Sequence, residues 1–227
     1  MNGLVIGCGH GLGKVLCEML SEQGHKVTAG FLNKKDVRPD FFQGPDITSY
    51  HMDVADEGTL EKAASEIRKN NIRFDAVLDV AGVLPQCDRD ETLLTSSIEE
   101  FMTTLRINVA GIILTFRTFY PLMKKGGMFI AMSSDGGSFA IDSDLFPGYS
   151  ISKTAATRTV QILKCTVRDV DVIALHPGRM NTRMGRTTAL IEPEEAAEGI
   201  CKIIDKTIRI EEGLWYVDYR GEPMPFC

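Results

Sequence analysis

The sequence predicts an α/β fold, in which helices cover both faces of a doubly wound parallel sheet. Short apolar runs rich in Val, Ile and Leu, about seven in number, recur along the chain. Segments with the apolar spacing of amphipathic helices lie between most of them, and this alternation specifies parallel strands joined by crossover helices. The chain has 227 residues, 44% of them hydrophobic, without an internal repeat or linker. We therefore expect one domain over residues 1–227.

The expected elements alternate from the N-terminus onward. Each strand is expected where a short aliphatic or aromatic run is bounded by polar residues, and each helix where apolar residues recur every three or four positions. The expected strands are residues 4–6, 26–31, 49–52, 76–80, 128–132, 171–175 and 214–218. The expected helices are residues 12–21, 59–69, 98–124, 148–168 and 193–206. Ligands of such sheets bind outside the carboxyl ends of the strands, so motifs that follow strands carry the functional information.

The charge balance limits the kind of partner. Lys and Arg give 25 positive charges and Asp and Glu 31 negative ones, for a net charge of −6 at pH 7. An acidic chain is poorly suited to nucleic acid or an anionic membrane as its main partner. The longest apolar run, residues 109–116, is far shorter than the roughly 20 residues that cross a bilayer. The histidines and cysteines show no metal-ligand spacing, so we expect a cytoplasmic protein with a small-molecule ligand and no metal site.

A glycine-rich turn follows the first expected strand and opens the first expected helix, where a phosphate-binding turn would lie. The turn does not match a Walker phosphate-binding loop. That loop needs Gly where this chain has Cys8, and Ser or Thr where it has Val15. The spacing GxGxxG does not match either. Its third glycine would fall at Leu12 if the motif began at Gly7, and at Lys14 if it began at Gly9. The spacing GxxxGxG fits completely. The turn reads Gly7, Cys8, Gly9, His10, Gly11, Leu12, Gly13.

Two other interpretations of the turn stay open. A methyltransferase-type glycine loop also fits Gly7, Gly9 and Gly11, although such a domain usually has an acidic residue near the end of the second strand, where this chain has Asn33. A glycine-rich turn without any ligand is the second alternative, since a lone glycine motif is a weak signal.

Four polar residues further along form a candidate catalytic set. Tyr149 and Lys153 are four residues apart near the start of an expected helix, so both side chains lie on one helix face. Ser134 follows the fifth expected strand, and Asn108 lies inside the long expected helix before it. Each residue alone has an ordinary structural explanation, but together with a fitting glycine turn they indicate an active site.

With these motifs the chain resembles the short-chain dehydrogenase/reductase family, and in its C-terminal part the C-factor and Sniffer-like carbonyl reductase branch. The resemblance rests on the glycine spacing, an Ala-Gly pair after the fourth strand, the Tyr/Lys pair, the upstream Ser and a Pro-Gly after the sixth strand. One departure is Val80, where the family usually has Asn. The resemblance implies a Rossmann-type sheet with the strand order 3-2-1-4-5-6-7 and an NAD(P)-dependent oxidoreductase. It also implies a homodimer or homotetramer assembled through the long helices.

The resemblance also implies roles for these residues in hydride transfer between nicotinamide and a carbonyl or secondary alcohol. Tyr149 would act as acid and base, with its pKa lowered by Lys153 and the oxidised nicotinamide ring. Ser134 would orient the substrate oxygen, and Asn108 would hold a water that links Lys153 to solvent. The residues implied to bind cofactor are Gly7, Gly9, His10, Gly11, Leu12, Gly13, Asn33, Lys34, Asp53, Val54, Ala81, Gly82, Tyr149, Lys153, Pro177, Gly178 and Thr182.

The end of the second strand bears on the choice of cofactor. A carboxylate there would bind the adenosine ribose and repel a 2′-phosphate. The chain has Asn33, Lys34 and Lys35 instead, followed by Asp36. NADP(H) is therefore favoured over NAD(H). A protein that senses or signals with the nucleotide and does not turn it over is the main alternative to an enzyme, and a methyltransferase that binds S-adenosylmethionine is the next.

Overall fold

The computed structural model describes residues 1–38, 40–42, 44, 46–185 and 189–227. It contains a seven-stranded sheet with the order β3-β2-β1-β4-β5-β6-β7, in which every neighbouring pair is parallel. The predicted fold class and strand order are confirmed. The strands are β1 (Asn2–Ile6), β2 (Lys26–Phe31), β3 (Ile47–His51), β4 (Phe74–Asp79), β5 (Met123–Met132), β6 (Val170–His176) and β7 (Tyr216–Asp218).

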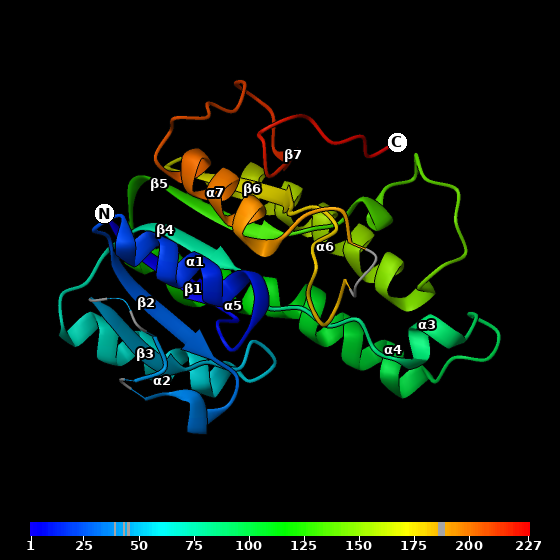
Figure 1. Cartoon of the computed structure of the whole chain (residues 1–227), viewed down its shortest axis with the longest axis horizontal. Helices are drawn as coiled ribbons and strands as arrows, with labels where there is room; N and C mark the ends of the chain where they lie inside the picture. Colours follow the sequence, from blue (N-terminus) through cyan, green and yellow to red (C-terminus); the bar gives the residue numbers. More distant parts are fainter. Residues whose placement is uncertain (39, 43, 45, 186–188) are drawn as a thin grey trace.

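Helices cover both faces of the sheet (Figure 1). On one face α1 (Gly11–Glu22) and α7 (Pro193–Ile204) lie side by side and pack onto a buried cluster that includes Val5. On the other face α2 (Glu57–Lys69), α5 (Gly111–Phe119) and α6 (Pro147–Thr166) pack onto a second cluster that includes Leu4 and Ile6. Successive residues of β1 thus enter opposite clusters, as the two-residue period of a strand requires. A sheet buried on both faces explains why its central strands β1 and β4 contain continuous apolar runs.

The helix expected over residues 98–124 is interrupted and ends earlier. α4 (Ile98–Leu105) is capped by Ser97, whose hydroxyl accepts a hydrogen bond from the Glu100 amide. The chain then passes through a π-helical turn (Arg106–Ala110) into α5. A short 3-10 turn with Pro121 follows, and residues 123 and 124 already belong to β5. The prediction of one helix to residue 124 was wrong, because apolar spacing reveals neither a π-helical turn nor the change from helix to strand.

Two short helices at the carboxyl end of the sheet had no periodic signal in the sequence. α3 (Cys87–Asp90) lies between β4 and α4, and the 3-10 helix η4 (Asp135–Gly137) follows β5. Both contact α6. Among the described residues, no helix is long and apolar enough to cross a membrane.

Candidate active site

A cavity of about 360 Å³ opens at the carboxyl ends of the strands. It is bordered by the segments that follow β1 to β6 and by the first turns of α6. Most of the residues that the sequence singled out for cofactor binding line this cavity. They are Gly7, Gly9, His10, Gly11, Leu12, Gly13, Asn33, Asp53, Val54, Ala81, Gly82, Tyr149, Lys153, Pro177 and Thr182.

Four predicted residues are not part of the cavity lining: Lys34, Asn108, Ser134 and Gly178. Lys34 is exposed in the short 3-10 helix after β2. Gly178 has a φ of 80°, and a Cβ there would lie 2.6 Å from Ile191, so this glycine permits a tight turn next to the cavity. Asn108 and Ser134 are buried, with 1% and 8% of their surface exposed.

The glycine turn combines close packing with an open surface. A Cβ at Gly13 would lie 2.4 Å from the Gly7 carbonyl oxygen, so α1 can approach β1 this closely only with glycine at that position. A Cβ at Gly9, in contrast, would meet no atom within 4 Å. Gly9 thus leaves room on the cavity side, directly before the N-terminus of α1.

The first turn of α1 is suited to bind an anion. His10 is the N-cap residue but makes no side-chain cap, and the first turn contains no acidic residue. The N–H groups at the start of a helix have no partner within the helix and attract negative charge. Open space at Gly9 beside these groups fits the pyrophosphate of a dinucleotide.

The segments after β2 and β3 form the opposite end of the cavity. Leu32, Asn33 and Asp36 line it after β2. Asp53 lines it after β3, while its Oδ1 accepts the Ala55 amide at 2.8 Å. A carboxylate therefore faces this end of the cavity at position 36, whereas Lys34 does not line it.

Lys153 and Tyr149 lie on one face of α6, as their spacing predicts. The Lys153 Nζ lies 5.6 Å from the centroid of the Tyr149 ring and donates a 2.7 Å hydrogen bond to the Met132 carbonyl. Burial lowers the pKa of Lys153 to about 8, and the charge of Asp79 opposes this shift. Asp79 is itself buried at the end of β4, and burial raises its pKa to about 6.

Burial dominates the pKa of Tyr149. Burial raises this pKa to about 12, and a hydrogen bond with Ser134 only partly offsets the effect of burial. The protein's own groups therefore keep the phenol protonated. The lowering of the Tyr149 pKa expected from Lys153 and an oxidised nicotinamide ring together therefore does not arise from the protein's own groups, because burial of the hydroxyl dominates.

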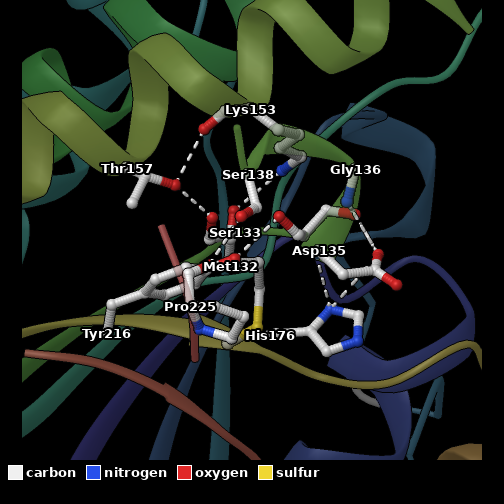
Figure 2. A network of polar contacts seen from close by, with 11 residues as sticks. Met132, Ser133, Asp135, Gly136, Ser138, Lys153, Thr157, His176, Tyr216 and Pro225 are labelled. Carbon is white, nitrogen blue, oxygen red and sulfur yellow. Dashed lines mark hydrogen bonds and ion pairs between the residues drawn. The ribbon is translucent and has the colours of Figure 1, made fainter. Parts of the chain in front are cut away.

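Ser134 is held by hydrogen bonds from β7 and from its own segment. The Tyr216 hydroxyl donates to its carbonyl oxygen at 2.8 Å, and its own Oγ accepts the Gly136 amide at 3.2 Å. Figure 2 shows Lys153 and Thr157 of α6 next to Ser133, whose hydroxyl bonds that of Thr157. The segment after β5 is thereby fixed against both α6 and β7.

The π-helical turn directs Asn108 into the protein. Its Oδ1 accepts the Val83 amide at 2.8 Å, and its Nδ2 donates to the Val83 carbonyl and to the Ser152 hydroxyl, each at 2.9 Å. Asn108 thus joins the segment after β4 to α6. Because both Nδ2 hydrogens are used, a water of the expected relay would have to bind other polar atoms of this residue.

Several cavity residues were missed by the sequence motifs. They are Leu32, Asp36, Met52, Ile107, Met132, Ser133 and Met180. Met52, Met132 and Ser133 could have been found by position, since they end or follow expected strands. Among the described residues, no group of three or more His, Cys, Asp or Glu side chains is arranged to hold a metal ion.

Comparison with known protein families agrees with this geometry. Residues 2–191 match the family model of short chain dehydrogenases. A 1-hydroxy-2-glutathionyl-2-methyl-3-butene dehydrogenase from Rhodococcus sp. (strain AD45) is 28% identical over 218 residues, which are 89% of this chain and 89% of the relative. An NADPH-dependent pterin aldehyde reductase from Arabidopsis thaliana is 26% identical over 204 residues, 85% of this chain and 82% of the relative.

Solved structures show the same fold. A putative short-chain dehydrogenase/reductase from Burkholderia multivorans with bound NADP superposes with a TM-score of 0.87 at 21% identity, over 99% of this chain and 98% of that one. The carbonyl reductase Sniffer of D. melanogaster superposes with a TM-score of 0.85 at 21% identity, with the same coverage. At this level of identity the likeness concerns the fold.

Proposed function

Since the chain belongs to the short-chain dehydrogenase family of oxidoreductases, we propose that it transfers hydride between NADP(H) and a small carbonyl compound or its secondary alcohol. The observation that carries the proposal is the convergence on one cavity of the glycine turn, Tyr149 and Lys153. A phosphate-binding turn and a proton donor on opposite segments of one cleft meet the needs of a nicotinamide enzyme.

The cofactor would be held by the residues that the cavity brings together. The amides after Gly9 would bind the pyrophosphate, while Asp53 and Val54 would contact the adenine end. Ala81, Gly82, Pro177 and Thr182 would border the nicotinamide end. When bound, the nicotinamide supplies or accepts the hydride. We treat residues 1–227 as one nucleotide-binding unit, since β1 and β7 belong to one sheet.

The proposed reduction needs a protonated donor beside the carbonyl oxygen. Tyr149 is in that state because burial keeps its pKa at about 12. As hydride reaches the carbonyl carbon, the phenol would give its proton to the oxygen. Lys153, charged below about pH 8, would stabilise the phenolate that remains. Ser134 would donate a hydrogen bond to the substrate oxygen, and Asn108 would keep the Val83 segment in place.

The preference for NADP(H) rests on the absence of a carboxylate at the end of β2 and on the basic residues that follow, Lys34 and Lys35. The Burkholderia multivorans structure, which contains NADP, supports it. Asp36 acts in the opposite direction, because a carboxylate in the cavity wall repels a 2′-phosphate. The ratio of the dissociation constants for NADPH and NADH measures the preference between the two nucleotides.

We also propose a homodimer or homotetramer. Apolar side chains are exposed on the outer faces of the helices that carry Asn108 and Tyr149. They are Ile98, Met102 and Ile113 on α4 and α5, and Ile151 and Ile162 on α6. Pairing such faces between copies would remove this apolar surface from water.

The function is tested by nucleotide binding and turnover in the same sample. We expect the purified protein to bind NADPH and to oxidise it with a panel of aldehydes, ketones and diketones, followed by nicotinamide absorbance. Tyr149→Phe should bind NADPH with unchanged affinity and lose at least about 100-fold in kcat, because the variant has no proton to donate.

Each other result contradicts the proposal in a defined way. Binding of NADPH without turnover of any carbonyl would indicate a nucleotide sensor. Failure to bind either nucleotide would overturn the cofactor assignment, and S-adenosylmethionine would then be titrated. Full activity of Tyr149→Phe would remove Tyr149 from the mechanism.

A further inference from the structure

Asp88 holds the start of the helix that carries Tyr149. It lies in α3 and is only 5% exposed. Its Oδ1 accepts a hydrogen bond from the Gly148 amide at 2.8 Å, and its Oδ2 accepts one from the Tyr149 amide at 2.6 Å. Both amides belong to the first turn of α6, where N–H groups have no partner within the helix. One carboxylate therefore fixes the backbone of the proposed proton donor itself.

The chain before α6 does not supply these acceptors. Phe146, the N-cap residue, has a φ of 52° and makes no side-chain cap, and Pro147 begins the helix. Gly148 allows the carboxylate to come close, since a Cβ there would lie 2.9 Å from Asp88 Oδ1. The start of α6 thus depends on a carboxylate from a segment 60 residues earlier in the chain.

The residue next to Asp88 connects the same short helix to the cavity wall. The Arg89 guanidinium donates to the carbonyl oxygen of Met184, which lines the cavity. It also lies over the Phe146 ring, 5.4 Å from the ring centroid. α3 therefore forms hydrogen bonds both with the helix that carries Tyr149 and with Met184, another residue that lines the cavity.

We propose that Asp88 is a positioning residue for the reduction, whose carboxylate sets where the Tyr149 hydroxyl stands relative to the substrate oxygen. The inference rests on the proposed function. Hydrogen bonds to an ionised carboxylate are stronger than those between neutral groups, so this pair suits a fixed geometry. A displacement of about 1 Å in a reacting group can slow a reaction about 100-fold. Loss of Asp88 should therefore affect kcat and spare nucleotide binding, because the glycine turn follows a different strand.

The experiment compares the wild-type protein with Asp88→Ala, which loses both acceptors, and Asp88→Asn, which keeps one. The matched control is Asp90→Asn, because Asp90 lies on the same short helix, is exposed, and accepts a hydrogen bond from Gln86. The kcat is divided by the number of NADPH-binding sites, so that partial unfolding does not count as loss of catalysis. We expect about 10- to 100-fold lower kcat per site for Asp88→Ala, a smaller loss for Asp88→Asn, none for Asp90→Asn, and an unchanged Kd for NADPH.

Amide hydrogen exchange over residues 148–152 measures the same contact without turnover. We expect slow exchange in the wild-type protein and faster exchange in both Asp88 variants. Unchanged kcat per site in Asp88→Ala, or an equal loss of kcat in Asp90→Asn, would overturn the proposal. If Asp88→Ala does not fold, unchanged kcat per site in Asp88→Asn would overturn it. A wild-type protein that reduces no carbonyl would contradict the proposed function. In that case the exchange experiment still tests whether Asp88 holds the first turn of α6. Equal exchange rates in wild type and Asp88→Asn would contradict this role, and faster exchange in the variant would support it.

Discussion

Asp79 and Lys153 are two buried groups of opposite charge next to the cavity. Burial raises the pKa of Asp79 to about 6 and lowers the pKa of Lys153 to about 8, while each charge opposes the shift of the other. Both groups are thus charged between about pH 6 and 8. Asp79→Asn removes the negative charge and leaves the burial of Lys153 unchanged, so the pKa of Lys153 should fall further. We expect the alkaline limb of kcat/KM, measured against pH, to move to lower pH in this variant.

A second carboxylate on the same strand provides the control for this prediction. Asp75 lies at the opposite end of β4 and pairs with Lys124 at 2.8 Å. Asp75→Asn should leave the alkaline limb of the pH profile where it is in the wild-type protein. If Asp79→Asn also leaves it unchanged, Lys153 does not control that limb.

The contact between two elements, η4 and α6, sets the distance between Ser134 and Tyr149. A Cβ at Gly137 would lie 2.6 Å from the carbonyl carbon of Lys153 and 2.7 Å from the Thr154 amide nitrogen. These are backbone atoms, which cannot move without shifting the helix. Gly137→Ala should therefore lower the free energy of unfolding by about 1–3 kcal/mol and lower kcat, because it moves the segment that follows Ser134 away from α6. Urea unfolding and steady-state kinetics measure the two effects.

The neighbouring glycine distinguishes packing from a general effect of the substitution. A Cβ at Gly136 would lie 3.5 Å from the Ser134 hydroxyl and 3.6 Å from the Ser150 hydroxyl, which are ordinary contacts. Gly136→Ala should therefore leave both the free energy of unfolding and kcat close to the wild-type values. Equal behaviour of the two variants would mean that η4 does not depend on close approach to α6.

For the whole molecule, the exposed apolar stripe on α4 and α5 predicts self-association. Ile98 and Met102 are 66% and 55% exposed on one side of α4. Light scattering after size exclusion should give two or four times the chain mass of 25.1 kDa, and the double variant Ile98→Lys, Met102→Lys should give a smaller assembly, because charges would be buried in the interface. Leu190→Lys is the control at an apolar residue elsewhere that is 89% exposed. A wild-type monomer would contradict the proposed assembly.

Local patterns explain how much of the protein could be predicted. The order of apolar runs predicted the strands, and the glycine spacing predicted the turn that lines the cavity, because strand period and turn geometry depend on neighbouring residues. The spacing of Tyr149 and Lys153 placed them on one helix face for the same reason. Lys34 and Gly178 lie beside the cavity and do not line it. Sequence position alone does not reveal which way such residues point.

The sequence by itself determined the α/β class and the candidate residues at the carboxyl ends of the strands, and its resemblance to a known family implied the strand order. Only the tertiary structure decided how these residues are held. A π-helical turn directs Asn108 to Val83, burial sets the pKa of Tyr149 and Lys153, and Asp88 reaches the first turn of α6 from another segment. The physical reason is that hydrogen-bond partners and desolvation depend on residues distant in the chain, which no local spacing encodes.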